Sequence, residues 1–240
     1  MDEIIGDAIV GIEFHTFSLV GRCQRTGALG VAITTSDVAV GSRCPFVKPL
    51  VGAVSTQAST DPRLGPFALQ LLNIGYSSTG AIQQLASSDP HIDRRQLGLV
   101  DREGNSAART GAHNNPWAGH IANNNYVSMG NGLAGQQVVD AMAEAFELSE
   151  PEDLEERLLR AIEAGQQAGG EARDSTPYHS AALLVYASDT FSRIDLRVDD
   201  HPTPIVELRR VFEIYQPRID YFSLRASDPA AAAAEIEAKA

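Results

Sequence analysis

The order in which strand-type and helix-type segments follow one another is the feature that most constrains the fold of this chain. Apolar residues alternate as in β-strands, or form short β-type runs, in residues 16–35, 49–59, 95–111, 179–187 and 191–200. They recur at helical spacing in residues 64–75, 78–87, 138–146, 154–162 and 204–215. No linker rich in Pro and Gly interrupts this order. The sequence therefore predicts one domain in which helices pack on sheets.

Length and hydropathy agree with a single folded domain. The 240 residues, 43% of them hydrophobic, suffice for one sizeable core. The longest apolar runs, such as residues 181–187, are far shorter than the ~18 residues of a membrane helix. Residues 1–15 hold four acidic side chains and no Lys or Arg, unlike a secretory signal. We expect a cytoplasmic protein with no membrane partner.

The charge balance argues against nucleic acid as a partner. Asp and Glu number 31 against 19 Lys and Arg, for a net charge of -12, which repels a phosphate backbone. The only lysines, Lys48 and Lys239, leave few candidates for a Schiff base. Cys23 and Cys44 are too few for a disulfide framework, and we expect them to be buried thiols rather than nucleophiles.

A cluster of acidic residues and one histidine near residue 200 raises the question of a metal. The stretch "DLRVDDHP" contains Asp195, Asp199, Asp200 and His201, but no other histidine pairs with His201 at a spacing typical of metal sites. Asp200 and His201 are better explained as the end of a strand and the start of the next helix. We predict no metal and no cofactor, and a metal-dependent hydrolase is the weakest interpretation.

One threonine stands at the mouth of the first strand, in "IEFHTFSLVG". From Thr16 onward, Phe17 and Leu19 lie on one face, and Ser18 and Val20 lie on the other, as in a half-buried strand. Thr16 can be a β-branched residue that suits a strand. The sequence around it also opens a second, functional interpretation.

Residues 15 to 215 resemble the bacterial DUF1028 family in eight blocks that occur in order. These blocks are "TFSLVGR", "TGALGVAITT", "AVGSRCPFVKPLVGAVSTQAS", "GPFALQLL", "RQLGLVDREGNSAARTG", "PWAGH", "GNGLAG" and "DLRVDDHPTPIVELRR". That family is grouped with the N-terminal nucleophile (Ntn) hydrolases. The resemblance implies an α+β fold, the four-layer αββα sandwich of Ntn hydrolases with mainly antiparallel sheets.

The resemblance also implies a role for Thr16. In Ntn hydrolases the first residue of the mature chain attacks an amide carbonyl, and its free α-amine, which titrates at roughly 7.7–8.0, serves as general base. Thr16 matches the family position that commonly follows the initiator Met, but here fifteen residues precede it. While the bond from His15 to Thr16 is intact, the Thr16 nitrogen is an amide without useful basicity.

The domain organisation follows from this position. We predict an N-terminal extension or propeptide in residues 1–15, an Ntn-hydrolase-like domain in residues 16–225 and an Ala-rich tail in residues 226–240. Three explanations of the extension stay open. It is a propeptide removed by autoproteolysis, an over-long start of the chain, or a retained segment that has abolished catalysis.

Five further residues are predicted site residues. Asn131, between glycines in "MGNGLAG", is the predicted oxyanion donor, although Asn in such a context is also ordinary in turns. Ser36, Thr56 and Gln57 line the same pocket if their strands neighbour the Thr16 strand. Arg173, in "GGEARDST", is placed to hold a substrate carboxylate, and a solvated loop charge is the alternative.

The predicted function is hydrolysis of a small-molecule or short peptide-like amide through an acyl-threonine ester, in a homo-oligomer. The competing hypothesis is a catalytically silent ligand-binding or assembly protein on the same fold, with Thr16 retained in mid-chain.

Overall fold

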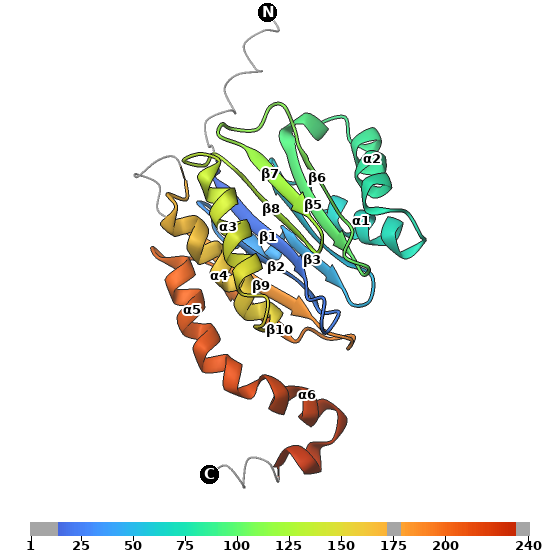
Figure 1. Ribbon diagram of the computed structural model, residues 1–240, viewed down its shortest axis with the longest axis vertical. Helices are drawn as coiled ribbons and strands as arrows, with labels where there is room; N and C mark the ends of the chain where they lie inside the picture. The colour runs from blue at the N-terminus through green and yellow to red at the C-terminus, as the bar shows by residue number, and fades with distance from the viewer. Residues whose placement is uncertain (1–13, 172–178, 234–240) are drawn as a thin grey trace, which may run out of the picture.

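The computed structural model describes residues 14–171 and 179–233, and its centre is a six-stranded antiparallel sheet (Figure 1). The strand order is β10-β9-β2-β1-β8-β7, so the strand that begins at Thr16 is central. Every pairing in this sheet is antiparallel. The strands are β1 (Thr16–Arg22), β2 (Leu29–Thr35), β7 (Gly119–Asn123), β8 (Tyr126–Asn131), β9 (Ser180–Tyr186) and β10 (Ile194–Val198).

A second, four-stranded antiparallel sheet packs face to face on the first. Its order is β3-β4-β5-β6, from β3 (Pro45–Lys48), β4 (Gly52–Ala58), β5 (Arg95–Asp101) and β6 (Ser106–Thr110). Strand β1 contacts β4 and β5 across the interface. A Cβ atom added to Gly98 of β5 would lie 2.8 Å from the Val127 side chain of β8, so the two sheets approach closely there.

Helices cover the outer face of each sheet. Helices α3 (Gln137–Leu148), α4 (Leu154–Gln167) and α5 (Pro204–Tyr215) pack on the six-stranded sheet, and α1 (Leu64–Asn73) and α2 (Ser78–Ser88) pack on the four-stranded sheet. Three short 3-10 helices connect the larger elements: η1 (Val40–Ser42), η2 (Ile92–Arg94) and η3 (Gln216–Arg218). The layers therefore run αββα, which confirms the predicted fold class.

The boundaries of the helices follow local chemistry. Helix α1 stops before Gly75, whose φ of 99° favours glycine. The cap of α2 is Ser77, whose hydroxyl accepts a hydrogen bond from the Gly80 amide at 3.1 Å. Pro204 occupies the first turn of α5, where its missing N–H costs nothing.

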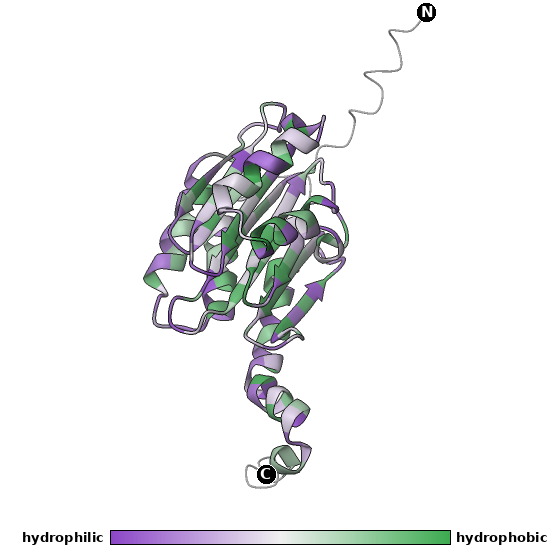
Figure 2. Cartoon of the chain, turned by 90° about the vertical axis from the view of Figure 1, so that its right-hand side faces the viewer, coloured by the Kyte–Doolittle hydropathy of each residue, from purple (hydrophilic) through white to green (hydrophobic). Residues whose placement is uncertain are grey.

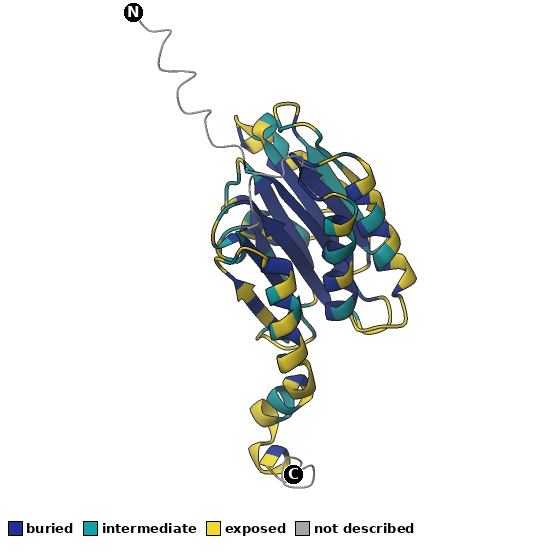
Figure 3. Cartoon of the chain, turned by 90° about the vertical axis from the view of Figure 1, so that its left-hand side faces the viewer, coloured by how far each residue is buried: buried dark blue, intermediate teal, exposed yellow. Residues whose placement is uncertain are grey.

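Strand β1 is buried on both faces, which corrects the half-buried strand expected from its alternation. Phe17 and Leu19 belong to the core under the helices, whereas Val20 belongs to the apolar layer between the sheets. The polar Ser18 on that second face is also fully buried. Figure 3 shows these buried strands as one dark blue layer under helices whose outer sides are exposed. A polar face in a strand therefore does not mean that it faces water.

Four elements were missed by the sequence patterns: β3, β7, β8 and α6 (Ile219–Ser227). Strands β7 and β8 lie outside the predicted strand segments, and the sequence of β7, GHIAN, shows little alternation, so its place depends on pairing with β8. Strand β3 is only four residues long. Helix α6 follows η3 and projects from the sandwich, and in Figure 2 this arm carries both hydrophilic and hydrophobic residues. Within residues 14–171 and 179–233, no helix is long and apolar enough to cross a membrane.

Candidate active site

The ends of three neighbouring strands bring Thr16 into a polar site. Thr16 is paired with Thr35 of β2 on one side and with Asn131 of β8 on the other. Its side chain lies on the same face of β1 as Val20, which packs between the sheets, because side chains alternate along a strand. All three residues are buried. Thr16 therefore points into the space between the two sheets, at one end of the sandwich.

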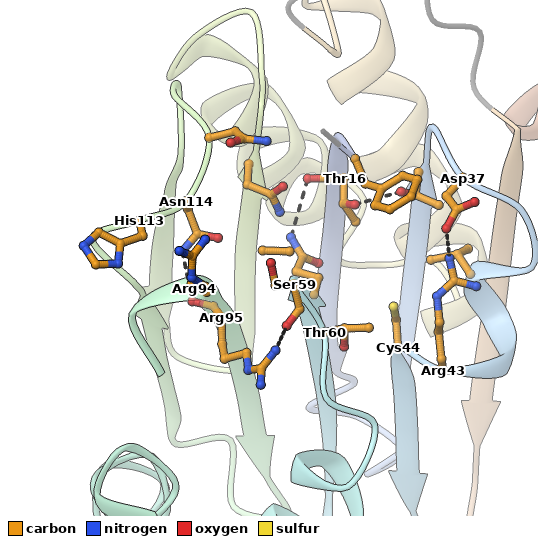
Figure 4. Close-up of a pocket in the computed structure, with 17 residues that line it drawn as sticks. Thr16, Asp37, Arg43, Cys44, Ser59, Thr60, Arg94, Arg95, His113 and Asn114 are labelled. Carbon is orange, nitrogen blue, oxygen red and sulfur yellow. Dashed lines mark hydrogen bonds and ion pairs between the residues drawn. The ribbon is translucent and has the colours of Figure 1, made fainter. Parts of the chain in front are cut away.

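A pocket of about 440 Å³ opens at this end and is bounded by both sheets. Thr16, Thr35 and Asn131 contribute from the six-stranded sheet, and Gln57 and Arg95 contribute from the four-stranded sheet. In Figure 4, Thr16 lies between a group made of His113, Asn114 and Arg94 and, opposite it, Asp37 and Arg43. The other lining residues are Phe14, Val40, Cys44, Ala58, Ser59, Thr60 and Asn115.

The hydrogen bonds of Thr35 fix the direction of the Thr16 hydroxyl. The Oγ1 atoms of Thr16 and Thr35 are 2.8 Å apart, and Thr35 Oγ1 donates to the carbonyl oxygen of His15 at 2.9 Å. A threonine hydroxyl has one hydrogen, so the hydrogen between the two threonines belongs to Thr16. Thr16 thus donates to Thr35 and keeps its oxygen lone pairs for a group in the pocket.

The peptide group that precedes Thr16 is held on both sides. The His15 carbonyl also accepts a hydrogen bond from the Ser36 amide at 3.0 Å, and the His15 amide donates to the Ser36 hydroxyl at 2.9 Å. Two donors at such distances resemble the arrangement that stabilises an oxyanion. Ser36 therefore contacts the chain on the N-terminal side of Thr16 and is not among the residues that line the pocket.

A network of buried amides supports the floor of the site. The side-chain oxygen of Gln96 on β5 accepts from Gln57 Nε2 at 2.8 Å and from Asn131 Nδ2 at 3.1 Å. Gln96 Nε2 in turn donates to the Gly130 carbonyl at 2.8 Å. Ser18 donates to Gln57 Oε1 at 2.7 Å, so the network crosses between the sheets. Gln96 is fully buried. Its sequence neighbours do not mark it as a site residue, because its polar partners lie on other strands.

The structure brings Thr16, Asn131 and Gln57 together at one pocket. Thr56 lies on the face of β4 opposite to that of Gln57, where its hydroxyl is 3.1 Å from the Thr60 hydroxyl. Thr56 is therefore not among the residues that line the pocket. Arg173 lies outside the described residues. The catalytic and binding roles assigned to these residues stay predictions.

Burial perturbs two ionisable groups near the site. Desolvation raises the pKa of Glu171 to about 8, and its Oε2 is 3.9 Å from Nδ1 of His15. Burial also raises the pKa of the pocket residue Cys44 to about 12, so its thiol is protonated at neutral pH. Cys44 is therefore a poor nucleophile beside Thr16.

The acidic cluster near residue 200 is dispersed into local contacts. The Asp200 carboxylate is 3.5 Å from His179, and His201 Nδ1 accepts from the Thr203 amide at 3.1 Å at the start of α5. In the part of the chain that the structure describes, no three His, Cys, Asp or Glu side chains are grouped so as to hold a metal ion.

Fold and site together define a class: an αββα sandwich with a buried threonine at the start of a central strand, at the mouth of a polar pocket. Residues 16–208 match the family described as "Family of unknown function (DUF1028)", and the chain belongs to this family. The crystal structure of protein SPO2555 from Silicibacter pomeroyi, a DUF1028 protein, is similar, with 32% identity, a TM-score of 0.77 and coverage of 84% of this chain and 86% of that one.

A more distant similarity is to Anbu (ancestral beta-subunit) from Yersinia bercovieri. The identity is 11% and the TM-score 0.36, over 86% of this chain and 96% of the other. No curated protein matches the chain.

Proposed function

We propose that the chain beginning at Thr16 is an Ntn-type amidohydrolase that cleaves a small-molecule or short peptide-like amide. The observation that carries the proposal is the Thr16 hydroxyl, which lines the pocket and donates its hydrogen to Thr35 at 2.8 Å. A nucleophile needs a directed lone pair and a place for its substrate, and Thr16 has both.

The chemistry uses groups of this chain alone. Thr16 Oγ1 attacks the amide carbonyl, and the α-amine of a Thr16 at the chain terminus accepts the hydroxyl proton and passes it to the leaving amine. Water then hydrolyses the acyl-threonine ester. Asn131 Nδ2 carries two N–H donors, and within the described residues Gln96 uses one of them. The second is the proposed donor to the developing oxyanion.

The intact chain lacks the required amine, and we propose that it cuts itself to obtain one. Thr16 Oγ1 attacks the His15 carbonyl carbon, its proton moves to the Thr16 nitrogen, and the C–N bond breaks to leave an ester. Water then releases the carboxylate of His15 together with Thr16 bearing a free amine and a free hydroxyl. The Ser36 amide and the Thr35 hydroxyl, which already donate to the His15 oxygen, would stabilise its negative charge.

Trimming also changes the pocket. Phe14 lines it, and His15 is buried against Gly132, where an added Cβ would lie 2.7 Å from the His15 ring. When these two residues are removed, the space beside Thr16 that they fill becomes available to the acyl group of a substrate. The pocket of about 440 Å³ already exists in the uncut chain, so trimming enlarges the room beside Thr16 and does not create the pocket.

The experiment compares the full-length chain with a chain that begins at Thr16, with both termini verified by mass spectrometry. Small amides and N-acyl amino acids are the substrates. The trimmed chain should turn over at least one of them, and the full-length chain should be slower by roughly 10²–10⁴-fold because it lacks the general base. Equal turnover by a full-length chain that keeps residues 1–15 would refute the α-amine mechanism.

The pH dependence gives an independent check. The kcat/KM of the trimmed chain should rise through about pH 8, as the α-amine loses its proton. Glu171 has a pKa of about 8, so it titrates in the same interval. A Glu171→Gln variant of the trimmed chain should keep the rise if the amine causes it.

Self-cleavage has its own test. Purified full-length protein is incubated and its intact mass is followed over time, beside a Thr16→Ala variant. The wild-type chain should lose residues 1–15, and the variant should stay whole. Cleavage of both proteins at this bond would assign the cut to another protease.

The second candidate function is a catalytically silent binding or assembly protein. It is favoured by the buried His15, whose peptide bond to Thr16 is intact and held by hydrogen bonds, beside a pocket that is present in the uncut chain. This candidate predicts that the full-length mass persists and that the trimmed chain hydrolyses none of the amides. A homo-oligomeric state and a cytoplasmic location stay predictions for both functions.

A further inference from the structure

The pocket differs in charge from the chain that forms it. The chain has a net charge of -12, yet the pocket lining includes Arg43, Arg94 and Arg95, and among the described residues that line it Asp37 is the only carboxylate. Arginine is favoured where a carboxylate is bound, because its planar guanidinium donates two parallel hydrogen bonds. This local excess of cations therefore favours ligands that carry a negative charge.

Two of the three arginines are neutralised by carboxylates. Arg43 Nη2 is 2.5 Å from Asp37 Oδ2. Arg95 Nε is 2.9 Å from Asp89 Oδ2, and a second nitrogen of Arg95 donates to the Ser59 carbonyl. Both guanidinium groups are committed to the protein, so they contribute little net charge to the pocket.

Arg94 is the cation that remains. It is exposed, and among residues 14–171 and 179–233 its guanidinium has no ion pair or side-chain hydrogen bond. Its backbone is fixed, because its carbonyl accepts from the Ser59 amide at 3.2 Å and its amide donates to the His91 carbonyl at 2.9 Å. The chain thus anchors Arg94 at the pocket and leaves its charge for another molecule.

Arg94 and Thr16 approach the pocket from opposite sheets. Arg94 ends η2 and directly precedes β5 of the four-stranded sheet, whereas Thr16 begins β1 of the six-stranded sheet. Figure 4 shows the two residues on different sides of the same space. A ligand that reaches both must carry an anionic group at a distance from its carbonyl.

We propose that the substrate is an amide that carries a carboxylate, bound by Arg94 while its amide carbonyl faces Thr16. This inference rests on the proposed hydrolase function and names the substrate class of the same site. A pocket of about 440 Å³ suits a small molecule, and an N-acyl amino acid is the simplest compound with both groups. Arg94 takes the role that the sequence suggests for Arg173.

Binding is measured on the full-length chain with Thr16→Ala, which holds the pocket and can neither cut itself nor hydrolyse a probe. The probes are N-acetylglycine and N-acetylglycinamide, which differ in one charge and are nearly equal in size, and NMR titration reports their affinities. N-acetylglycine should bind roughly 10–100-fold more tightly, because a charge-assisted contact to arginine is lost in the neutral compound. Added salt should reduce this difference.

Two arginine variants at opposite ends of β5 provide the matched comparison. Arg94→Gln should weaken binding of N-acetylglycine by a similar roughly 10–100-fold and leave N-acetylglycinamide unchanged. Arg102 directly follows β5 at its other end and pairs with Glu103 at 2.7 Å, so Arg102→Gln should change neither affinity. In the trimmed chain, Arg94→Gln should raise KM for the anionic amide and leave kcat nearly unchanged.

The outcomes separate this inference from the hydrolase proposal, because binding to the full-length chain requires no catalysis. Equal affinities for the two probes, no binding of N-acetylglycine, or an Arg94→Gln variant that binds as wild type would each overturn the assignment. Inorganic phosphate is a third probe. If it bound more tightly than N-acetylglycine, Arg94 would be assigned to a free oxyanion and not to the carboxylate of an amide.

Discussion

The layer between the two sheets has a polar end and an apolar end, built from the same strands and the same alternating faces. At the apolar end, Val20, Val31 and Val100 belong to the apolar cluster that packs between the sheets. Further along those strands, the positions of the same parity hold Thr16, Thr35 and Gln96. All six side chains are buried, so burial does not distinguish the two ends. What differs is the use of the space: one end packs, and the other holds donors, acceptors and a pocket.

The polar end is stable because its groups satisfy one another. A buried amide without a partner costs about 1–3 kcal/mol. Gln96 pairs with Gln57 and Asn131 from the two sheets, and it also reaches the Thr110 hydroxyl at 2.9 Å. The comparison teaches that the apolar end fixes the distance between the sheets and the polar end fixes the orientation of the side chains around Thr16.

The largest expected effect comes from removing the proposed nucleophile at the polar end. In the trimmed chain, Thr16→Ala should abolish hydrolysis, because no oxygen remains to form the ester, whereas Thr16→Ser should retain part of it. Both variants should unfold near the wild-type temperature, since a methyl or hydroxyl at a pocket edge is a small packing contribution. Turnover assays and thermal unfolding measure the two properties. Undiminished turnover in Thr16→Ala would exclude Thr16 as the nucleophile.

The second prediction breaks the polar network at its centre. Gln96→Leu keeps the approximate size of the side chain but leaves Gln57 Nε2 and Asn131 Nδ2 without their acceptor. We expect a loss of about 4 kcal/mol in the free energy of unfolding, since several buried polar groups lose partners at about 1–3 kcal/mol each. Urea unfolding measures it, and Gln83→Leu on the exposed side of α2 is the control. A variant as stable as this control would show that the network contributes little.

The third prediction tests the apolar end. Val31→Ala removes two methyl groups from a fully buried position between the sheets. The free energy of unfolding should fall by about 2 kcal/mol, from lost burial and the cavity that remains. In the trimmed chain the turnover per folded molecule should not change. A fall in turnover per folded molecule would show that the two ends are not separable in function.

Much of this arrangement could be predicted from the sequence, and particular residues show where prediction stops. The alternation in β1, β2 and β10 and the helical spacing in α3 and α4 are local properties, so the sequence revealed them. The close pairing of Thr16 with Asn131 joins strands that are far apart in the chain, so no local pattern predicts it. Local patterns determine elements better than they determine neighbours.

Gln96 and Arg94 illustrate what the sequence could not supply. Gln96 is the second residue of β5 and looks like a polar residue at an exposed strand start, yet it is fully buried because the six-stranded sheet covers it. Arg94 stands beside Arg95 in the chain, but Arg95 has a carboxylate partner and Arg94 has none within the described residues. Such differences depend on tertiary contacts. Thr56 and Gln57 were both predicted to line the pocket, but adjacent side chains of a strand point to opposite faces, and only Gln57 lines it.

The fourth prediction uses adjacent threonines as a matched pair. Thr35→Val removes the acceptor of the Thr16 hydrogen and a donor to His15, whereas Thr34→Val removes a bond to the Ser180 carbonyl at 2.9 Å on the other face of β2. Each lost hydrogen bond should cost stability by a similar 0.5–1.5 kcal/mol or so. Only Thr35→Val should also lower the kcat of the trimmed chain, by about tenfold. Equal kcat values in the two variants would show that the Thr35 hydroxyl does not contribute to turnover.

The smallest effect is expected at Cys44, which supplies a thiol to the lining of the same pocket. Only a thiolate attacks carbonyls effectively, and burial that raises the pKa of Cys44 to about 12 keeps the thiol protonated near neutral pH. Cys44→Ala should therefore leave the turnover of the trimmed chain close to wild type, and an alkylating reagent should not inhibit the native enzyme. Both assays test whether the nucleophile at the polar end is the Thr16 hydroxyl oxygen or the Cys44 sulfur. Loss of activity in Cys44→Ala, with stability unchanged, would transfer the nucleophile from β1 to the segment between η1 and β3 and would make a free α-amine unnecessary.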